Sequence, residues 1–177
     1  MNENEKQKLR ERAKALAREP QSAERAEAAE ERIQVIEFLL AYERYGIESS
    51  FIREVYPLKD LTPLPCTPPF VLGIINVRGQ IRSVLDIKRF FDLPQKGLTD
   101  LNQVLLVRGD DMELGILADE VLGVRSLPMS AIQPAPATLT GIRAEYLRGV
   151  TADRLILLNV AAILSDERIL VDEEVEP

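Results

Sequence analysis

Three carboxylates, Asp86, Asp119 and Glu120, are the side chains whose type could support acid–base catalysis. Such catalysis requires two groups that reach the same substrate, one of them with a shifted pKa. The sequence contains no histidine, which excludes Ser-His-Asp and Cys-His arrangements and histidine-bound metals. The single cysteine, Cys66, has no partner within the chain for a disulfide or a zinc cluster, and we interpret it as a small apolar residue rather than a nucleophile. We therefore expect no metal site and no cofactor, and the repeat described next leads us to expect no catalytic residue.

A partial repeat in the sequence explains Asp86 without catalysis. The segment LGIINVRGQIRSVLDIKRFF (72–91) resembles LRGVTADRLILLNVAAIL (147–164), and each contains a glycine, a short strand, a turn and a second strand. Asp86 follows the second strand in one copy and Asn159 in the other. Both residue types cap helices, because either side-chain oxygen accepts from the free amides of the first turn, but only Asp exchanges protons. We predict that Asp86 is a helix cap; a hydrolase remains the alternative and requires two of the three carboxylates in one cleft.

The turn within this segment contains Arg78 and Gly79. Gly79 suits a tight hairpin turn with positive φ. For Arg78 two interpretations stay open, a solvated turn residue or a partner for a carboxylate across the barrel or on another protein. Gly73 and Gly149 begin the equivalent strands of the two copies and predict bends or close backbone approaches.

The repeat extends to the segments that precede each copy. A shift of 69 residues superposes Val35 on Val104, Ile36 on Leu105, Gly46 on Gly115, Ile47 on Ile116 and Val55 on Val124. VRGDDMELGI (107–116) carries a hairpin signal, and RIQVIEFLLA (32–41) favours a strand over a continuing helix. Because cores this small are marginal alone, we predict an all-β fold of two small SH3/OB-like five-stranded β-barrels packed together.

Composition divides the chain and narrows its partners. We predict a charged helical N-terminal extension (1–31), two barrel subdomains (32–100 and 101–165) and an acidic C-terminal tail (166–177). The extension has only a thin apolar stripe, so a solvated helix is favoured over a docking segment. A net charge of −7 and the absence of tryptophan argue against nucleic acid. No signal-peptide core or membrane-length apolar run occurs, which predicts a cytoplasmic protein without direct membrane insertion.

These segments together resemble the CheW family of chemotaxis proteins. The most diagnostic blocks are GIINVRG, VLDI and LGILADEV, and the similarity runs from about residue 33 to 164. The resemblance implies two five-stranded barrels in which a strand is exchanged between halves. It also implies a non-enzymatic adaptor that couples the cytoplasmic tips of methyl-accepting chemoreceptors to the regulatory domain of the histidine kinase CheA, within arrays at the inner face of the membrane. A CheW-like decoy that binds only the kinase is the alternative.

The resemblance also implies two sets of contact residues. The receptor groove between the barrels would include Ile52, Glu54, Gln103, Val104, Leu105 and Val124. The aliphatic members would receive the apolar stripe of the receptor helices, although Val104, Leu105 and Val124 could instead be core strand residues. The kinase contacts would include Leu61, Leu64, Ile81, Gln133, Ala137 and Thr138. Ser83 stands where the family commonly has proline, and the 133–139 loop lacks the large apolar residue of some members.

Overall fold

The computed structural model describes residues 4–14, 30–136 and 142–169, in two units that comprise Met1–Arg32 and Ile33–Pro177. Within the first unit, residues 4–14 form a helix whose side chains are all exposed, including Leu9. The predicted helical extension is confirmed over these residues. No helix among the described residues is long and apolar enough to cross a membrane.

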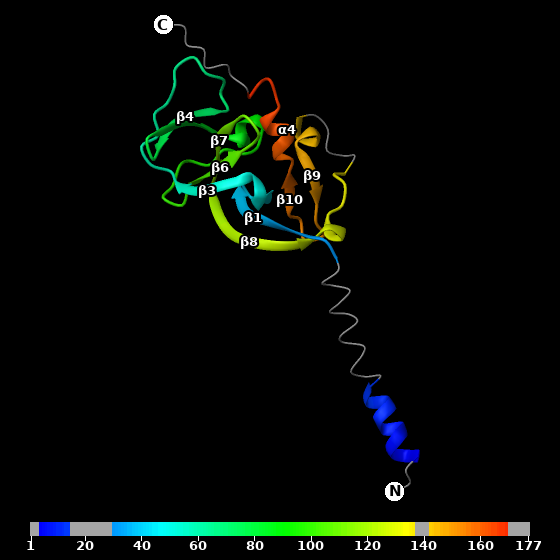
Figure 1. The fold of residues 1–177 in the computed structure, drawn as a ribbon. Coiled ribbons are helices and arrows are strands. Elements are labelled where there is room, and N and C mark those ends of the chain that lie inside the picture. Colours follow the sequence, from blue (N-terminus) through cyan, green and yellow to red (C-terminus); the bar gives the residue numbers. More distant parts are fainter. Residues whose placement is uncertain (1–3, 15–29, 137–141, 170–177) are drawn as a thin grey trace. The chain divides into compact units, whose positions relative to one another are not determined.

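The described part of the second unit is built mainly from short strands (Figure 1). In chain order the elements are β1 (Arg32–Leu40), β2 (Glu43–Glu48), η1 (Ser49–Phe51), β3 (Ile52–Pro57), β4 (Val71–Val77), β5 (Gln80–Leu85), α2 (Ile87–Phe90), β6 (Gln103–Arg108), β7 (Glu113–Ala118), β8 (Glu120–Pro128), η2 (Met129–Ala131), α3 (Ile142–Glu145), β9 (Leu147–Val150), β10 (Ile156–Leu158) and α4 (Val160–Leu164). The strand predicted for RIQVIEFLLA and the hairpin predicted for VRGDDMELGI are both present, as β1 and as β6–β7.

The ten strands form two five-stranded sheets, which confirms the predicted fold class. Sheet A has the order β8-β1-β2-β10-β9 and sheet B the order β3-β6-β7-β5-β4. Sheet B is therefore continuous in sequence, whereas sheet A combines strands from before and after it; in Figure 1 blue and orange strands lie in one sheet. The predicted division into 32–100 and 101–165 does not follow the sheets, because the two halves of the repeat exchange their first hairpins, β1–β2 and β6–β7.

Pairing within the sheets repeats with the duplication. The hairpins β1–β2 and β6–β7 are antiparallel, and each packs its second strand parallel to the last strand of the other half: β10 beside β2, and β5 beside β7. The turn of β6–β7 closes where the amide of Gly109 donates to the carbonyl of Met112 at 2.8 Å. The duplication read from the sequence is thus visible in the sheet order.

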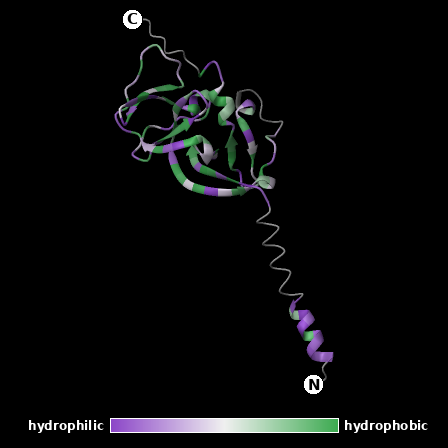
Figure 2. Cartoon of the chain, viewed as in Figure 1, coloured by the Kyte–Doolittle hydropathy of each residue, from purple (hydrophilic) through white to green (hydrophobic). Residues whose placement is uncertain are grey.

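Among the residues that the structure describes, apolar side chains form three clusters, one inside each barrel and one between the barrels. On β6, Val104 and Leu106 point into the interior of the sheet B barrel, while Leu105 and Val107 point into the central cluster. This alternation follows from the two-residue period of a strand. The central cluster combines residues of both sheets with α2 and α4, so the barrels share a core. Hydrophobic residues occur along strands of both sheets (Figure 2).

The folded part extends further toward the C-terminus than predicted. Ile169 is buried in the central cluster, and the buried Tyr146 donates through its hydroxyl to Asp166, which Arg168 also binds at 2.9 Å. The acidic tail predicted from residue 166 therefore does not include residues 166–169, because Ile169 adds apolar burial and Asp166 anchors the turn.

Candidate functional site

Asp86 is a helix cap, as predicted. Its Oδ1 accepts from the backbone amide of Lys88 at 3.1 Å at the start of α2. In the second copy, Oδ1 of Asn159 accepts from the amide of Ala162 at 3.1 Å at the start of α4. A capping bond is thus made by a carboxylate in one copy, to the amide two residues on, and by a side-chain amide in the other, to the amide three residues on.

The environment of Asp86 meets part of what catalysis would need. Burial raises the pKa of the Asp86 carboxyl, against the lowering effect of Lys88, and the charge of Asp119 adds to the increase. However, the carboxylate of Asp119 is engaged by the ammonium of Lys88 and by the amide of Ala41 at 2.7 Å. The cavity described below is lined by none of the three candidate carboxylates. Asp86 and Asp119 therefore hold helix α2 and the β7–β8 connection in place, and neither lines that cavity.

Gly73 and Gly149 mark close backbone approaches, as predicted. A Cβ on Gly73 would lie 2.4 Å from the carbonyl oxygen of Thr62, and one on Gly149 would lie 2.5 Å from that of Gln133. These approaches allow the bridges that pair Thr62 with Ile74 and Gln133 with Val150. In both barrels, a loop between strands is therefore fastened at a glycine.

The turn between β4 and β5 aims Arg78 across the end of the sheet B barrel. Arg78 and Gly79 have φ of 52° and 82°, which is the pattern of a type I′ hairpin turn. Gly79 donates its amide to Oδ1 of Asn76 at 2.8 Å. The guanidinium of Arg78 lies 3.0 Å from Oε1 of Glu54 on β3, although its side chain is 78% exposed. Of the two interpretations for Arg78, the structure supports a partner for a carboxylate across the barrel.

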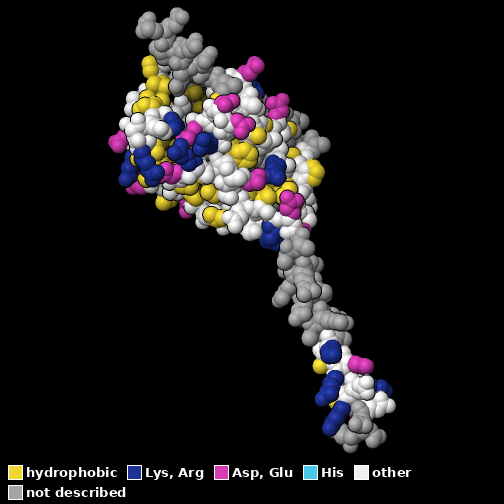
Figure 3. Space-filling model, in the orientation of Figure 1, with side chains coloured by type: hydrophobic (Ala, Val, Ile, Leu, Met, Phe, Trp, Pro, Cys, Tyr) yellow, Lys and Arg dark blue, Asp and Glu magenta, His cyan; other side chains and the backbone are white. Residues whose placement is uncertain are grey.

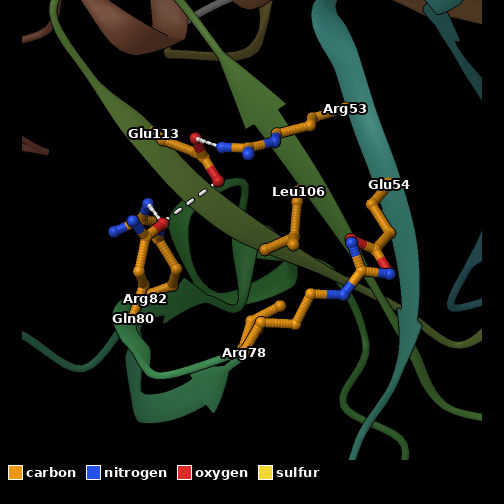
Figure 4. Close-up of a pocket in the computed structure, with 8 residues that line it drawn as sticks. Arg53, Glu54, Arg78, Gln80, Arg82, Leu106 and Glu113 are labelled. Atoms are coloured by element: carbon orange, nitrogen blue, oxygen red, sulfur yellow. Dashed lines mark hydrogen bonds and ion pairs between the residues drawn. The ribbon is translucent and has the colours of Figure 1, made fainter.

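A charged cavity of about 190 Å³ lies at this end of the barrel, between β3, β5 and β7 (Figure 4). Glu113 lies between Arg53, at 2.8 Å, and Arg82, at 3.0 Å. Burial disfavours the Glu113 carboxylate, but hydrogen bonds from Arg53 and Arg82 outweigh it and lower its pKa. Leu106 and Arg78 complete the wall toward Glu54. Basic side chains gather in one region of the globular surface with acidic ones among them (Figure 3). The charged side chains that line this cavity therefore form ion pairs with one another, and Glu54 is one of them.

The structure separates the predicted receptor-binding residues into two groups. Val104 and Leu105 are fully buried, so their inclusion in a docking surface is corrected: both faces of β6 pack into the core. Ile52, Glu54 and Gln103 are half-buried on the neighbouring strands β3 and β6. Val124 is 66% exposed on the edge strand β8. Exposed aliphatic surface is thus available from Val124, but not from β6.

Four of the six predicted kinase-binding residues lie in described parts of the two barrels. Leu61 and Leu64 are half-buried in the loop between β3 and β4, and Ile81 is 55% exposed on β5. Gln133 is exposed beside Gly149. The other two residues predicted for this surface, Ala137 and Thr138, lie outside the described residues.

Two polar arrangements were not predicted. Lys88 is a buried cation next to Asp119, and Glu113 is held by Arg53 and Arg82. A lysine that comes shortly after an apolar strand and directly follows Ile87 was a signal for the first, since a buried charge needs a partner. That partner is 31 residues away, and no spacing rule indicates it.

Comparisons with known proteins agree with the fold and the repeat. A family model described as a CheW-like domain matches residues 34–168. The chemotaxis protein CheW of Treponema pallidum is 30% identical over 79% of this chain and 86% of its own length. CheW of Klebsiella aerogenes is 35% identical over 76% of this chain and 84% of its own length. The protein FrzA of Myxococcus xanthus is 34% identical over 71% of this chain and 81% of its own length.

A solved structure gives the same result. The crystal structure of the scaffolding protein CheW from Thermoanaerobacter tengcongensis is similar with a TM-score of 0.65 and 29% identity, over 72% of this chain and 83% of that one. Since the family model covers most of the chain and the two exchanged five-stranded sheets match the fold, the chain belongs to the CheW family.

Proposed function

We propose that this protein is a non-enzymatic adaptor that couples the cytoplasmic tips of chemoreceptors to a CheA-type histidine kinase. The observation that carries the proposal is the CheW-like match over residues 34–168, which spans both barrels. The names of the relatives, chemotaxis protein and scaffolding protein, support the same role. In this role the protein is cytoplasmic and associates with the inner face of the membrane through receptor arrays.

The receptor-facing surface in this proposal consists of Ile52, Glu54, Gln103 and Val124. Val124 and the neighbouring Leu122, which is 45% exposed, offer aliphatic area for a receptor helix. Glu54 lies at the rim, held by Arg78, and supplies a fixed charge. A charge at the rim of an interface sets register and association rate more than affinity.

The kinase-facing surface in this proposal consists of other residues than the receptor-facing one. It consists of the loop with Leu61 and Leu64, of Ile81, and of the 133–138 segment. Ile81 and the half-buried leucines belong to the sheet B barrel, and Gln133 lies beside the sheet A barrel. Each barrel would then meet one kinase regulatory domain, which lets one adaptor join two neighbours and raises avidity without new contacts.

A pull-down tests the coupling as a whole. Tagged full-length protein and a variant lacking residues 1–31 would be used as bait in lysate from the source cell. Recovery of a CheA-type kinase and of chemoreceptors with both baits is the expected result. Recovery of the kinase without receptors would instead identify a decoy, and recovery of neither would refute the adaptor role.

Point variants test the two surfaces separately. Glu54→Arg should weaken receptor coupling while kinase affinity stays within about twofold, because a rim charge acts locally. Ile81→Asp should weaken kinase binding and spare the receptor. Leu98→Asp is the matched control, since Leu98 is as exposed as Ile81 but lies in the loop before β6. Equal losses of both partners in either variant would contradict the assignment of surfaces.

A further inference from the structure

The chain passes between the two sheets at two equivalent places. After β2 it leaves sheet A through η1 and enters β3; after β7 it leaves sheet B through one residue, Asp119, and enters β8. The amide of Asp119 donates to the carbonyl of Leu39 at 2.9 Å, so the second crossover is fixed to β1 through its backbone.

The side chain of Asp119 connects elements on both sides of this crossover. Oδ2 accepts from the amide of Ala41, in the β1–β2 turn of sheet A, at 2.7 Å. Oδ1 accepts from the ammonium of Lys88 on α2, which directly follows β5 of sheet B. Lys88 is only 1% exposed. One carboxylate therefore binds both barrels at the point where the chain passes from one to the other.

A buried ion pair of this kind adds little net stability, but it fixes how the elements that carry the two charges are oriented. Removing two charges from water costs about as much as their attraction returns, so such pairs are poor sources of net stability and are best attested in fixing register. The apolar central cluster holds the barrels together, but the hydrophobic effect has no direction. The pair supplies a direction, because the ammonium of Lys88 and the carboxylate of Asp119 stay in contact only while α2 and the β7–β8 connection remain next to each other.

The duplication provides an internal comparison. The 69-residue shift places Asp119 on Ser50, and the alignment of the caps Asp86 and Asn159 places Lys88 on Ala161. The equivalent positions at the first crossover hence carry no charge. The Lys88–Asp119 pair thus has no charged counterpart at these two described positions, so the two otherwise similar junctions differ in what fixes them.

We propose that Lys88 and Asp119 are positioning residues that set the orientation of one barrel relative to the other, and with it the spacing of the edge strands β3 and β8. The inference rests on these contacts and stands independently of the adaptor function. A partner that contacts both β3 and β8 would depend on the distance between these strands, which the Lys88–Asp119 ion pair maintains.

Electron–electron resonance between two spin labels tests this in the full chain. One label is attached to the exposed Cys66, between β3 and β4, and the other to Ala152→Cys, exposed between β9 and β10. The proposal expects a narrow distance distribution for the parent. It expects a broader or shifted one for Lys88→Met and for the double variant Lys88→Met, Asp119→Asn, and a parent-like one for Lys88→Arg, which keeps the ion pair.

Thermal unfolding separates positioning from stability. Lys88→Met leaves the Asp119 carboxylate without its cation and should lower the Tm, whereas the double variant also removes the charge of Asp119 and should recover part of that loss. Ile75→Val is the control. Ile75 lies inside one barrel, so this variant should lower the Tm without changing the distance between the labels. A parent-like distance distribution in the double variant, or one in Lys88→Arg as broad as in Lys88→Met, would overturn the proposal. The double variant decides even if Lys88→Met does not fold.

Discussion

Replacing Asp86 by Asn tests whether this buried carboxylate acts only as a helix cap. The second copy already makes the substitution in effect, since Asn159 caps α4 with a bond of the same length, 3.1 Å. Asn and Asp are nearly equal as caps, so Asp86→Asn should change the free energy of unfolding by less than about 1 kcal/mol at neutral pH. Asp86→Ala, which has no acceptor, should be about 1 kcal/mol less stable than Asp86→Asn.

The pH dependence of the Asp86 variant follows from its raised pKa. Because burial lifts the folded-state pKa above the unfolded value of about 3.9, the protonated form is favoured by folding. The stability linked to Asp86 is fully present below about pH 4 and is lost as the pH rises through the folded-state pKa. Asn does not titrate, so the stability of Asp86→Asn relative to the parent should rise between pH 4 and pH 7. Arg89, 3.7 Å from Asp86, is half exposed and offsets little of this.

The assay is urea unfolding of the parent, Asp86→Asn and Asp86→Ala at several pH values between 3.5 and 7. Equal m-values would show that the denatured states remain comparable. A deficit of more than about 2 kcal/mol for Asp86→Asn at pH 7, or a deficit that grows with pH, would refute the reasoning, because the carboxylate charge itself would then be required.

Three further predictions concern features that the structure resolves. Gly73→Ala should lower the free energy of unfolding by at least about 2 kcal/mol, because its Cβ would meet a backbone oxygen at 2.4 Å. Gly79→Ala has open space around it and should lose only about 1 kcal/mol, from its positive φ. Urea unfolding that ranks the two variants the other way would contradict the close approach at Gly73. Arg125 donates to Asp153 at 2.6 Å and lowers its pKa, so Arg125→Gln should bring the Asp153 titration seen by NMR up toward about 3.9, and an unchanged midpoint would exclude this bond in solution. Burial, then a hydrogen bond to a carboxylate, raises the pKa of Tyr146 to about 12. Tyr146→Phe should therefore remove a step near pH 12 from the phenolate absorbance titration, and loss of a step near the ordinary tyrosine value of about 10 would contradict the burial.

Local features of this chain were predictable because their physical rules span only a few residues. The caps at Asp86 and Asn159, the turn at Gly79 and the close approach at Gly73 each follow from one residue type and its neighbours. The family resemblance implied that a strand is exchanged between the two halves, but it did not indicate that a whole hairpin is exchanged. No local rule states which of two similar sheets a hairpin joins when the copies share their pattern.

Burial was harder to predict than secondary structure. The run QVLLV on β6 is apolar at consecutive positions, which fits a strand buried on both faces as well as one with an exposed aliphatic face. Only the packing of the two barrels decides this, and it buries Val104 and Leu105. The pairing of Lys88 with Asp119 depends on the same packing. The contact surfaces inferred from resemblance therefore needed the structure to separate core from surface.

The sheet order has a consequence for the order in which the nascent chain can fold. Sheet B is complete once residue 118 has left the ribosome, but β2 ends at Glu48 and its partner β10 ends roughly 110 residues later. At a synthesis rate of about 5–20 residues per second, the first hairpin waits on the order of 5–20 s for that partner. During this interval the apolar face with Phe38 and Tyr45 lacks its final neighbours, so co-translational folding begins in the middle of the sequence and sheet A closes around it last.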